Sequence, residues 1–330
     1  MLIMNVKQVE INWHRDLSIY ASEPSLKAVS DEYGWLGGID DSGKLRCILP
    51  FTVIRKSALR MVRFRVETIT LGEDIDIQSE KAFLNSAVEY FRFKGLDMII
   101  PATTNTIFRT YPNGAYAAPY GTYIIDLRQS EDTIWRNLST SHRRKVRLAK
   151  KKKILIKSGL EHLKTAYTLV RDTFQRSAMP YMSFDAFKNM VNGFGEYVKV
   201  LVADYQGVAH GCVVIPFSNH SAYYLYGGSA SKPVTGANNL LHWEGIRQFR
   251  ELGVKRYDFV GVRINPERGS KQEGLMTFKQ RFGGQLVKGY MWKYGIHPFK
   301  FAFYTIAVRL LRGGDIVDNE RHKLKTSGTF

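Results

Sequence analysis

The 330-residue chain is long enough for two ordinary domains, and its 44% hydrophobic and 13% aromatic content excludes an intrinsically disordered protein. Its two cysteines, Cys47 and Cys212, lie far apart in apolar runs, and its eight histidines lack paired-ligand spacing, so neither a disulfide scaffold nor a metal site is indicated. No apolar run reaches the length of about 18 residues that a membrane-spanning helix needs. We therefore expect a reduced, cytoplasmic protein whose net charge of +18 favours polyanionic partners.

The first 126 residues are predicted to form a mixed α/β domain. Apolar runs predict strands at 34–39, 45–54 and 61–71, and a helical pattern follows from 80 to 93. Gly95 ends this helix, and a strand at 96–100 stops at Pro101. A loop rich in Pro, Gly and Tyr then leads to a strand at 122–127.

A basic linker helix is predicted next, over residues 127–153. Ser130 suits its N-cap, with Glu131 and Asp132 in the first turn. Residues 133–160 contain ten basic side chains and no acidic one, which is +10 of the total charge. A solvated helix face is the simple alternative, but the absence of compensating acids favours a phosphate-rich partner. The residues predicted to bind this partner are Arg143, Arg144, Arg147, Lys150, Lys151, Lys152 and Lys153.

Residues 154–295 are predicted to form a second α/β domain, followed by a tail at 296–330. The expected order is a strand at 154–157, helices at 161–176 and 184–193, and strands at 197–205, 209–217 and 221–227. A helix at 238–252, a strand at 255–260, a helix at 274–281 and a strand at 285–293 complete it. This is the element order of the GNAT acyltransferase fold, and the first domain follows a trimmed version of it. We therefore predict an α/β protein with mixed sheets, built from two tandem GNAT-like domains.

Several segments resemble the FemABX-type aminoacyltransferases, tandem GNAT enzymes that add amino acids to the peptidoglycan stem peptide. The matching segments are IWRNLSTSHRRKVRLAKKKKI, FQRSAMPYMSFDAFKNMV and the stretch from YYLYGGS to FKQRFGG, which together cover about half of the chain. The resemblance implies aminolysis of an activated acyl group through a tetrahedral oxyanion. It implies an aminoacyl-tRNA donor, a nucleotide- or lipid-linked peptidoglycan precursor as acceptor, and no cofactor. The phosphate-rich partner of the basic residues from Arg143 to Lys153 would then be this tRNA.

The resemblance also assigns roles to three residues. Lys279, within MTFKQRFGG, matches the family lysine that stabilises developing negative charge; a solvent-facing lysine is the alternative. Arg176 and Tyr181 lie where the family binds the nucleotide-sugar end of the acceptor, and a guanidinium grips a diphosphate in a bidentate manner. An arginine that complements a helix C-terminus is an equal alternative for Arg176.

Three further residues are candidates from the pattern itself. Tyr224 and Tyr226 are predicted to share one face of their strand, where they would line the acceptor cleft or relay a proton, whereas Tyr223 takes the other face. Asp258 ends a strand before Gly261, so it could orient or deprotonate the amine. The alternatives are core packing for the tyrosines and backbone capping for Asp258.

The turn containing Gly236, Asn238 and Asn239 occupies the position where CoA-dependent GNAT enzymes bind pyrophosphate. The six residues from Pro233 read PVTGAN, which keeps the central glycine but lacks the usual first and last residues of that motif. The loop is still predicted to hold an anion of the substrate. The departure from the motif favours aminoacyl-tRNA over acetyl-CoA or another acyl-CoA.

Two other functions stay open at this point. One is a CoA-dependent N- or O-acyltransferase acting on a cell-envelope sugar, and the other is a non-catalytic nucleic-acid-binding protein on a GNAT scaffold. The tail segment HPFKFAFYTIAVRLLR, residues 297–312, is aromatic and basic. It is expected either to pack back on the first domain or to lie on the inner membrane surface.

Overall fold

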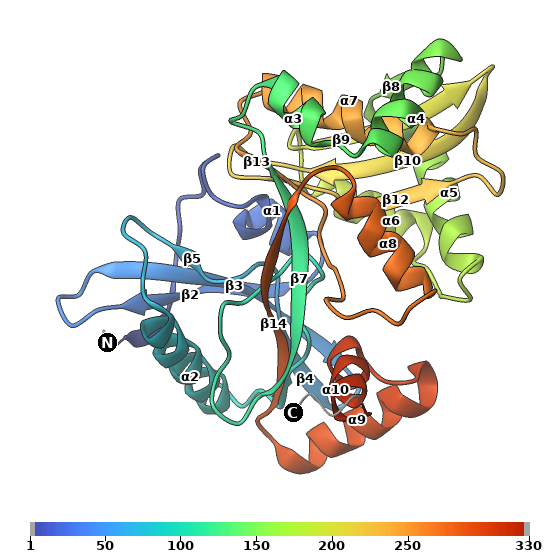
Figure 1. Ribbon diagram of the computed structural model, residues 1–330. Helices are drawn as coiled ribbons and strands as arrows, with labels where there is room; N and C mark the ends of the chain where they lie inside the picture. The colour runs from blue at the N-terminus through green and yellow to red at the C-terminus, as the bar shows by residue number, and fades with distance from the viewer. Residues whose placement is uncertain (1–3, 327–330) are drawn as a thin grey trace.

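Two β-sheets organise residues 4–326, the part of the chain that the computed structural model describes (Figure 1). The larger sheet has the strand order β1-β2-β3-β4-β6-β14-β7-β13-β11, with β5 paired to β3, and the smaller sheet has the order β12-β10-β9-β8. The predicted α/β fold with mixed sheets is confirmed. The strands are β1 (Asn5–Val9), β2 (Glu32–Ile39), β3 (Leu45–Lys56), β4 (Leu59–Phe64), β5 (Ile69–Thr70), β6 (Met98–Ile99), β7 (Tyr116–Asp126), β8 (Leu155–Ser158), β9 (Val198–Tyr205), β10 (Val208–Pro216), β11 (Ala222–Tyr223), β12 (Tyr226–Ser229), β13 (Arg256–Asp258) and β14 (Gln285–Gly295).

Helices cover both sheets. The helices are α1 (Glu23–Lys27), α2 (Ile77–Phe93), α3 (Glu131–Asn137), α4 (Thr140–Lys151), α5 (Leu163–Gln175), α6 (Phe184–Asn192), α7 (Ala237–Glu251), α8 (Lys271–Gln280), α9 (Pro298–Arg312) and α10 (Ile316–Thr326). The predicted strand at 61–71 ends earlier, at Phe64, and the predicted helix at 80–93 begins earlier, at Ile77. The reason is an N-cap at Asp76, whose side chain accepts a hydrogen bond from the Ser79 amide.

Strand β14 joins the two halves of the chain into one sheet. It pairs antiparallel with β7 over nine residues, from Gln285 opposite Ile124 to Lys293 opposite Tyr116, and then with β6 at Tyr294 and Ile99. The long β7 and β14 cross the middle of the molecule in Figure 1. The predicted division at Asp126 coincides with the end of β7, although the sheet itself continues across it; the domain boundaries stay a prediction.

The single linker helix predicted over 127–153 is wrong, because the segment forms two helices, α3 and α4. Leu138 between them is extended, with φ −60° and ψ 139°. Ser139 caps α4 by accepting a hydrogen bond from the His142 amide, and Arg143 Nη1 donates to the carbonyls of Arg136 and Leu138 at 2.6 and 2.9 Å. A new cap at Ser139 and a guanidinium on the last carbonyls of α3 satisfy groups that a continuous helix would pair internally.

The strand predicted at 221–227 is also wrong as one element, since this run divides between the two sheets. Tyr223 in β11 pairs with Asp258 of the larger sheet, whereas Tyr226 in β12 pairs with Val214 of the smaller sheet. The amide of Tyr224 still donates to the Asp258 carbonyl at 2.8 Å, and that of Leu225 already donates to Val214. The two sheets therefore separate at Tyr224 and Leu225.

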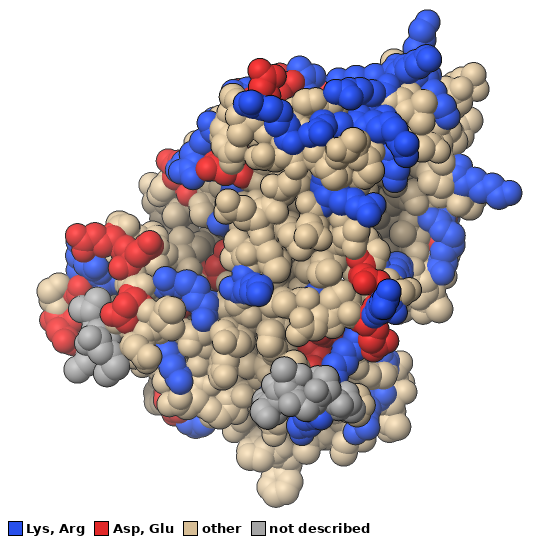
Figure 2. Space-filling view, in the orientation of Figure 1, with Lys and Arg blue, Asp and Glu red and all other residues tan. Residues whose placement is uncertain are grey.

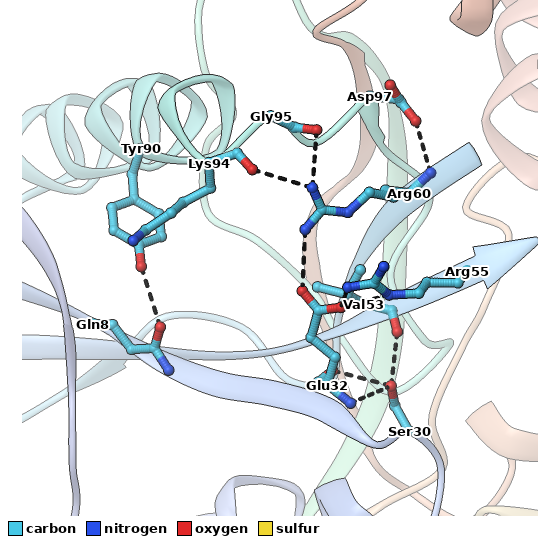
Figure 3. Close-up of polar contacts among 10 residues, drawn as sticks. All are labelled: Gln8, Ser30, Glu32, Val53, Arg55, Arg60, Tyr90, Lys94, Gly95 and Asp97. Atoms are coloured by element: carbon cyan, nitrogen blue, oxygen red, sulfur yellow. Dashed lines mark hydrogen bonds and ion pairs between the residues drawn. The ribbon is translucent and has the colours of Figure 1, made fainter. Parts of the chain in front are cut away.

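Helix α9 is fixed on the first-half strands by one apolar and one charged contact. Phe301 packs with Met61, Met98 and Ile100. Lys300 Nζ donates to Asp97 Oδ1 at 2.7 Å. The other oxygen of Asp97 accepts from the Arg60 amide at the edge of the contact network drawn in Figure 3. No helix within residues 4–326 combines the length and the apolar character that crossing a membrane requires.

Candidate active site

Lys279 is buried near the C-terminal end of α8, with 8% of its surface exposed. This burial excludes the solvent-facing alternative. Its Nζ donates hydrogen bonds to the backbone carbonyls of Val260 and Gly261, at 2.5 and 2.8 Å. Burial lowers the pKa of Lys279 to about 8, and nearby Asp258 opposes that shift. An ammonium has three N–H donors, so one remains for an acceptor at this position.

Asp258 lies at the end of β13 and is 3% exposed. Its Oδ1 accepts hydrogen bonds from Thr122 Oγ1 and from the Val260 amide, at 2.5 and 2.7 Å. The expected backbone capping is therefore present. Burial raises the pKa of the Asp258 carboxyl, and the charges of Arg256 and Lys279 oppose the rise. The carboxylate and the Lys279 ammonium thus share the turn that follows β13.

Tyr224 and Tyr226 do not share a face, which corrects the alternation expected from an unbroken strand. Because the sheets separate between them, Tyr224 packs at 4.4 Å against His242 in one core cluster. Tyr226 packs against Tyr181 at 5.7 Å in another cluster, which also contains Tyr223. The Tyr224 hydroxyl is enclosed in the protein, and burial raises its pKa. Tyr226 therefore joins the other predicted acceptor residues, and Tyr224 does not.

Arg176 and Tyr181 both contact β12, the strand of the smaller sheet that carries Tyr226. Arg176 is the exposed C-cap of α5, and its Nη2 donates to the Ser229 carbonyl of β12 at 2.6 Å and to Thr173 Oγ1 at 2.9 Å. The Tyr181 hydroxyl is buried without a hydrogen-bond partner among the described residues. Arg176 thus combines the predicted helix-terminal position with a contact to the strand that carries Tyr226.

The first half contributes polar side chains that the sequence analysis missed. Tyr20 stacks edge-on at 5.0 Å against Tyr223, and its hydroxyl is buried without a partner within residues 4–326. Glu67 Oε1 lies 3.6 Å from Arg256 Nη2. Burial lowers the pKa of Arg65 to about 9, and neighbouring Tyr20 opposes this shift. The sequence carries no distinct signal for them, since Arg65 and Glu67 lie in a run that also contains Arg60 and Arg63.

Gly236, Asn238 and Asn239 lie under α4 rather than at an open surface. Gly236 is the N-cap of α7 with φ 92°, and a Cβ there would meet the Lys145 carbonyl oxygen at 2.3 Å. Asn239 is 6% exposed, and Asn238 Oδ1 has no hydrogen-bond partner in the described chain. The turn is therefore closely packed against α4, and a side chain at position 236 would collide with the α4 backbone.

Replacing Gly236 with Ala is expected to destabilise the fold by about 2 kcal/mol or more, because the new Cβ strains a left-handed residue and displaces α4. Gly253→Ala is the matched control, since Gly253 also has a positive φ of 75° but nothing within 4 Å of the added Cβ. Urea unfolding compares the two variants. Equal losses of stability would show that α4 is not closely packed on this turn.

The predicted tRNA-binding residues, which lie on α4 and in the turn directly after it, divide into two groups. Arg143 binds the carbonyls that end α3, Arg147 lies over the Trp135 ring at 5.6 Å, and Lys150 pairs with Glu244 at 3.0 Å. The second group is exposed and forms no ion pair within residues 4–326. Figure 2 shows basic side chains gathered over the upper end of the molecule, where Figure 1 places α4. The members of the second group are Arg144, Lys151, Lys152 and Lys153.

Comparisons with known proteins find similarity to parts of the sequence and to most of the fold. A sequence model described as an acetyltransferase (GNAT) domain matches residues 136–280. The lipid II:glycine glycyltransferases of Staphylococcus haemolyticus and Staphylococcus saprophyticus are 35% and 32% identical over 74 and 82 residues. These alignments cover 22% and 24% of this chain and 18% and 20% of the relatives, so the chain spans about a fifth of the length of the curated relatives it matches.

Two solved structures resemble the whole described fold. FemX superposes with a TM-score of 0.65 at 15% identity, covering 90% of this chain and 99% of FemX. The C-terminal domain of a putative lysylphosphatidylglycerol synthetase from Agrobacterium fabrum superposes with a TM-score of 0.53 at 12% identity, covering 88% and 95% of the two chains. At these identities the likeness establishes the fold.

Proposed function

We propose that this chain, whose fold resembles that of FemX and whose residues 136–280 match a GNAT acetyltransferase domain, transfers an amino acid from an aminoacyl-tRNA to an amine of a peptidoglycan precursor. The observation that carries the proposal is the buried ammonium of Lys279, held by two backbone carbonyls with one N–H donor left. The lipid II:glycine glycyltransferases that match part of the chain favour a peptidoglycan precursor as acceptor.

The proposed reaction is aminolysis of an ester. The amine nitrogen attacks the ester carbonyl carbon, a C–N bond forms, and the C–O bond to the tRNA ribose breaks. The proton lost by the amine passes to the departing ribose oxygen. The remaining N–H donor of Lys279 stabilises the oxyanion of the tetrahedral intermediate, in a site where a preorganised donor is worth more than in water.

Asp258 is proposed to orient the attacking amine and to accept its proton. Asp258→Asn is expected to lower the transfer rate about tenfold to a hundredfold at neutral pH, since general-base help is lost. The effect should shrink as pH rises, because more of the amine is then already deprotonated. A rate–pH profile for both proteins measures this.

Asp204→Asn is the matched control, because Asp204 is also a buried strand carboxylate, paired with Lys157 at 2.9 Å and distant in the fold on β9. This control should lose stability but keep the wild-type profile. If the Asp258→Asn rate were reduced by the same factor at every pH, Asp258 would not be the group that accepts the proton.

The donor is proposed to be aminoacyl-tRNA rather than acyl-CoA. The turn before α7 is packed against α4, with Gly236 touching the Lys145 backbone and Asn239 buried, which leaves little room for a pyrophosphate. The exposed cations of α4 offer a surface for a nucleic-acid backbone instead. Calorimetric titration tests the choice: charged tRNA should bind saturably, and acetyl-CoA should not. Micromolar binding of acetyl-CoA would favour the CoA-dependent alternative.

The acceptor is proposed to bind between the two halves of the chain. Arg176 would hold its anionic end, and Tyr181 and Tyr226 would lie beside it. Tyr20, which packs on Tyr223, would contribute from the first half of the chain. Such an enzyme would work in the cytoplasm, at the inner face of the membrane where precursors are assembled. Both cysteines are free and buried, as expected for a reducing compartment, and burial raises each thiol pKa to about 12.

A further inference from the structure

Helix α9 carries a stripe of large apolar side chains that the fold leaves uncovered. Its members recur every three or four residues, so they fall within ~60° of one another around the helix axis. The stripe runs for roughly 17 Å along the helix at 1.5 Å per residue. The four side chains, with their exposed fractions, are Phe299 (84%), Phe303 (67%), Ile306 (59%) and Leu310 (81%); Leu311 (79%) adds to one side.

The side of α9 opposite the stripe packs on the protein, and this contact makes the stripe point away from the fold. Phe301 is buried against β4 and β6, and Lys300 is paired with Asp97. At the C-terminal end, Gly313 closes the helix with φ 70°, and the following α10 buries Val317 against Ala118 and Tyr120 of β7. The helix is therefore held at both ends, and the apolar stripe is presented outwards by the fold.

The charge beside the stripe is positive. Helix α9 contains no acidic residue, and Arg309 and Arg312 are both exposed on its last turn. Neither guanidinium forms an ion pair with the described residues 4–326. In Figure 2 the lower end of the molecule is a mainly uncharged projection with basic side chains above it.

We propose that α9 docks the protein on an anionic phospholipid surface, with its apolar stripe inserted at the level of the headgroups. A helix with one apolar face and basic flanks lies in the plane of such an interface. Phe and Leu side chains enter the acyl boundary, Arg309 beside the stripe meets lipid phosphates, and Arg312 at the helix end adds positive charge. The proposal stands independently of catalysis, and it specifies where the proposed enzyme would meet a lipid-linked acceptor.

A second copy of this chain fits the stripe less well. An antiparallel two-fold contact through α9 would place the last-turn arginines of each copy beside the first turn of the other, which carries no acidic residue. The arginines would therefore gain no ionic partner in such an interface. An anionic surface neutralises them instead.

Vesicle co-sedimentation of the full chain tests the proposal. Vesicles of phosphatidylcholine with phosphatidylglycerol should bind the protein, and the double variant Phe299→Ser, Phe303→Ser should bind about tenfold or more weakly. Both side chains are largely exposed, so the variant should keep the wild-type melting temperature. Arg309→Gln with Arg312→Gln should reduce the preference for anionic over neutral vesicles.

Two controls separate α9 from the rest of the surface. Leu155→Ser with Leu160→Ser removes two exposed apolar side chains on and beside β8, 59% and 48% exposed, and should not change vesicle binding. Binding at 0.5 M salt isolates the apolar contribution from the basic surface of α4. Unchanged binding of the Phe299→Ser, Phe303→Ser variant would overturn the proposal. The proposal would also be overturned if the protein bound no vesicles and instead formed, without lipid, a dimer that these substitutions dissociate.

Discussion

Replacing Lys279 with Met is expected to lower the rate of aminoacyl transfer about 10²–10³-fold, the usual cost of losing one oxyanion donor. Methionine is one atom shorter than lysine and suits the buried position, so the fold should remain. Binding of tRNA should also remain, because Lys279 is buried whereas the cations proposed to bind tRNA are exposed. Single-turnover transfer with enzyme in excess measures the chemical step.

The pH dependence gives a second test of Lys279. Its pKa of about 8 means that the donating, protonated form is lost as pH rises through that value. The wild-type rate should therefore fall above about pH 8, whereas a Lys279→Arg variant with residual activity should keep its rate there, because arginine stays protonated. Lys164→Met, on the exposed side of α5, is the control for removing a lysine. Full activity of Lys279→Met would show that Lys279 is not the oxyanion donor.

Neutralising Arg144, Lys151, Lys152 and Lys153 together, each to Gln, is expected to weaken tRNA binding roughly tenfold to a hundredfold. Each lost phosphate contact should also reduce the slope of log affinity against log salt by ~0.7–0.9. The four side chains are exposed and unpaired within residues 4–326, so their removal should leave the melting temperature unchanged. Filter binding across a salt series measures both quantities.

The matched control neutralises cations away from α4. Lys44→Gln with Lys56→Gln removes two exposed lysines from β3 and the turn before it. This variant should bind tRNA with nearly the wild-type salt slope. If the α4 variant keeps the full slope, the tRNA surface lies elsewhere, and the basic charge of this segment has another use.

The element order of the fold could be predicted from the sequence because apolar periodicity survives in both halves. Besides shifts in element boundaries, the structure divided two predicted elements, and local hydrogen bonds explain both divisions. Ser139 ended one helix and began another, since its side chain competes for a backbone amide. The run from Tyr223 to Tyr226 changed sheets, so simple alternation assigned Tyr224 to the wrong surroundings.

The candidate site was only partly predictable. Lys279 and Asp258 could be found, since one lies in a segment resembling a family and the other ends a strand before a glycine. Tyr20 and Arg65 could not, because their importance arises from the packing of the first half against Tyr223 and Tyr226. Long-range contacts of this kind leave no local periodicity.

The most direct test of the central claim is mass spectrometry of a peptidoglycan precursor after incubation with the protein and a pool of charged tRNA. Parallel reactions use nucleotide-linked and lipid-linked precursors, and acetyl-CoA replaces the tRNA in a third. We predict that the precursor gains the mass of an amino acid residue only with charged tRNA, and that Lys279→Met abolishes the gain. An acetyl mass gain with acetyl-CoA, or no gain with any charged tRNA, would contradict the assignment.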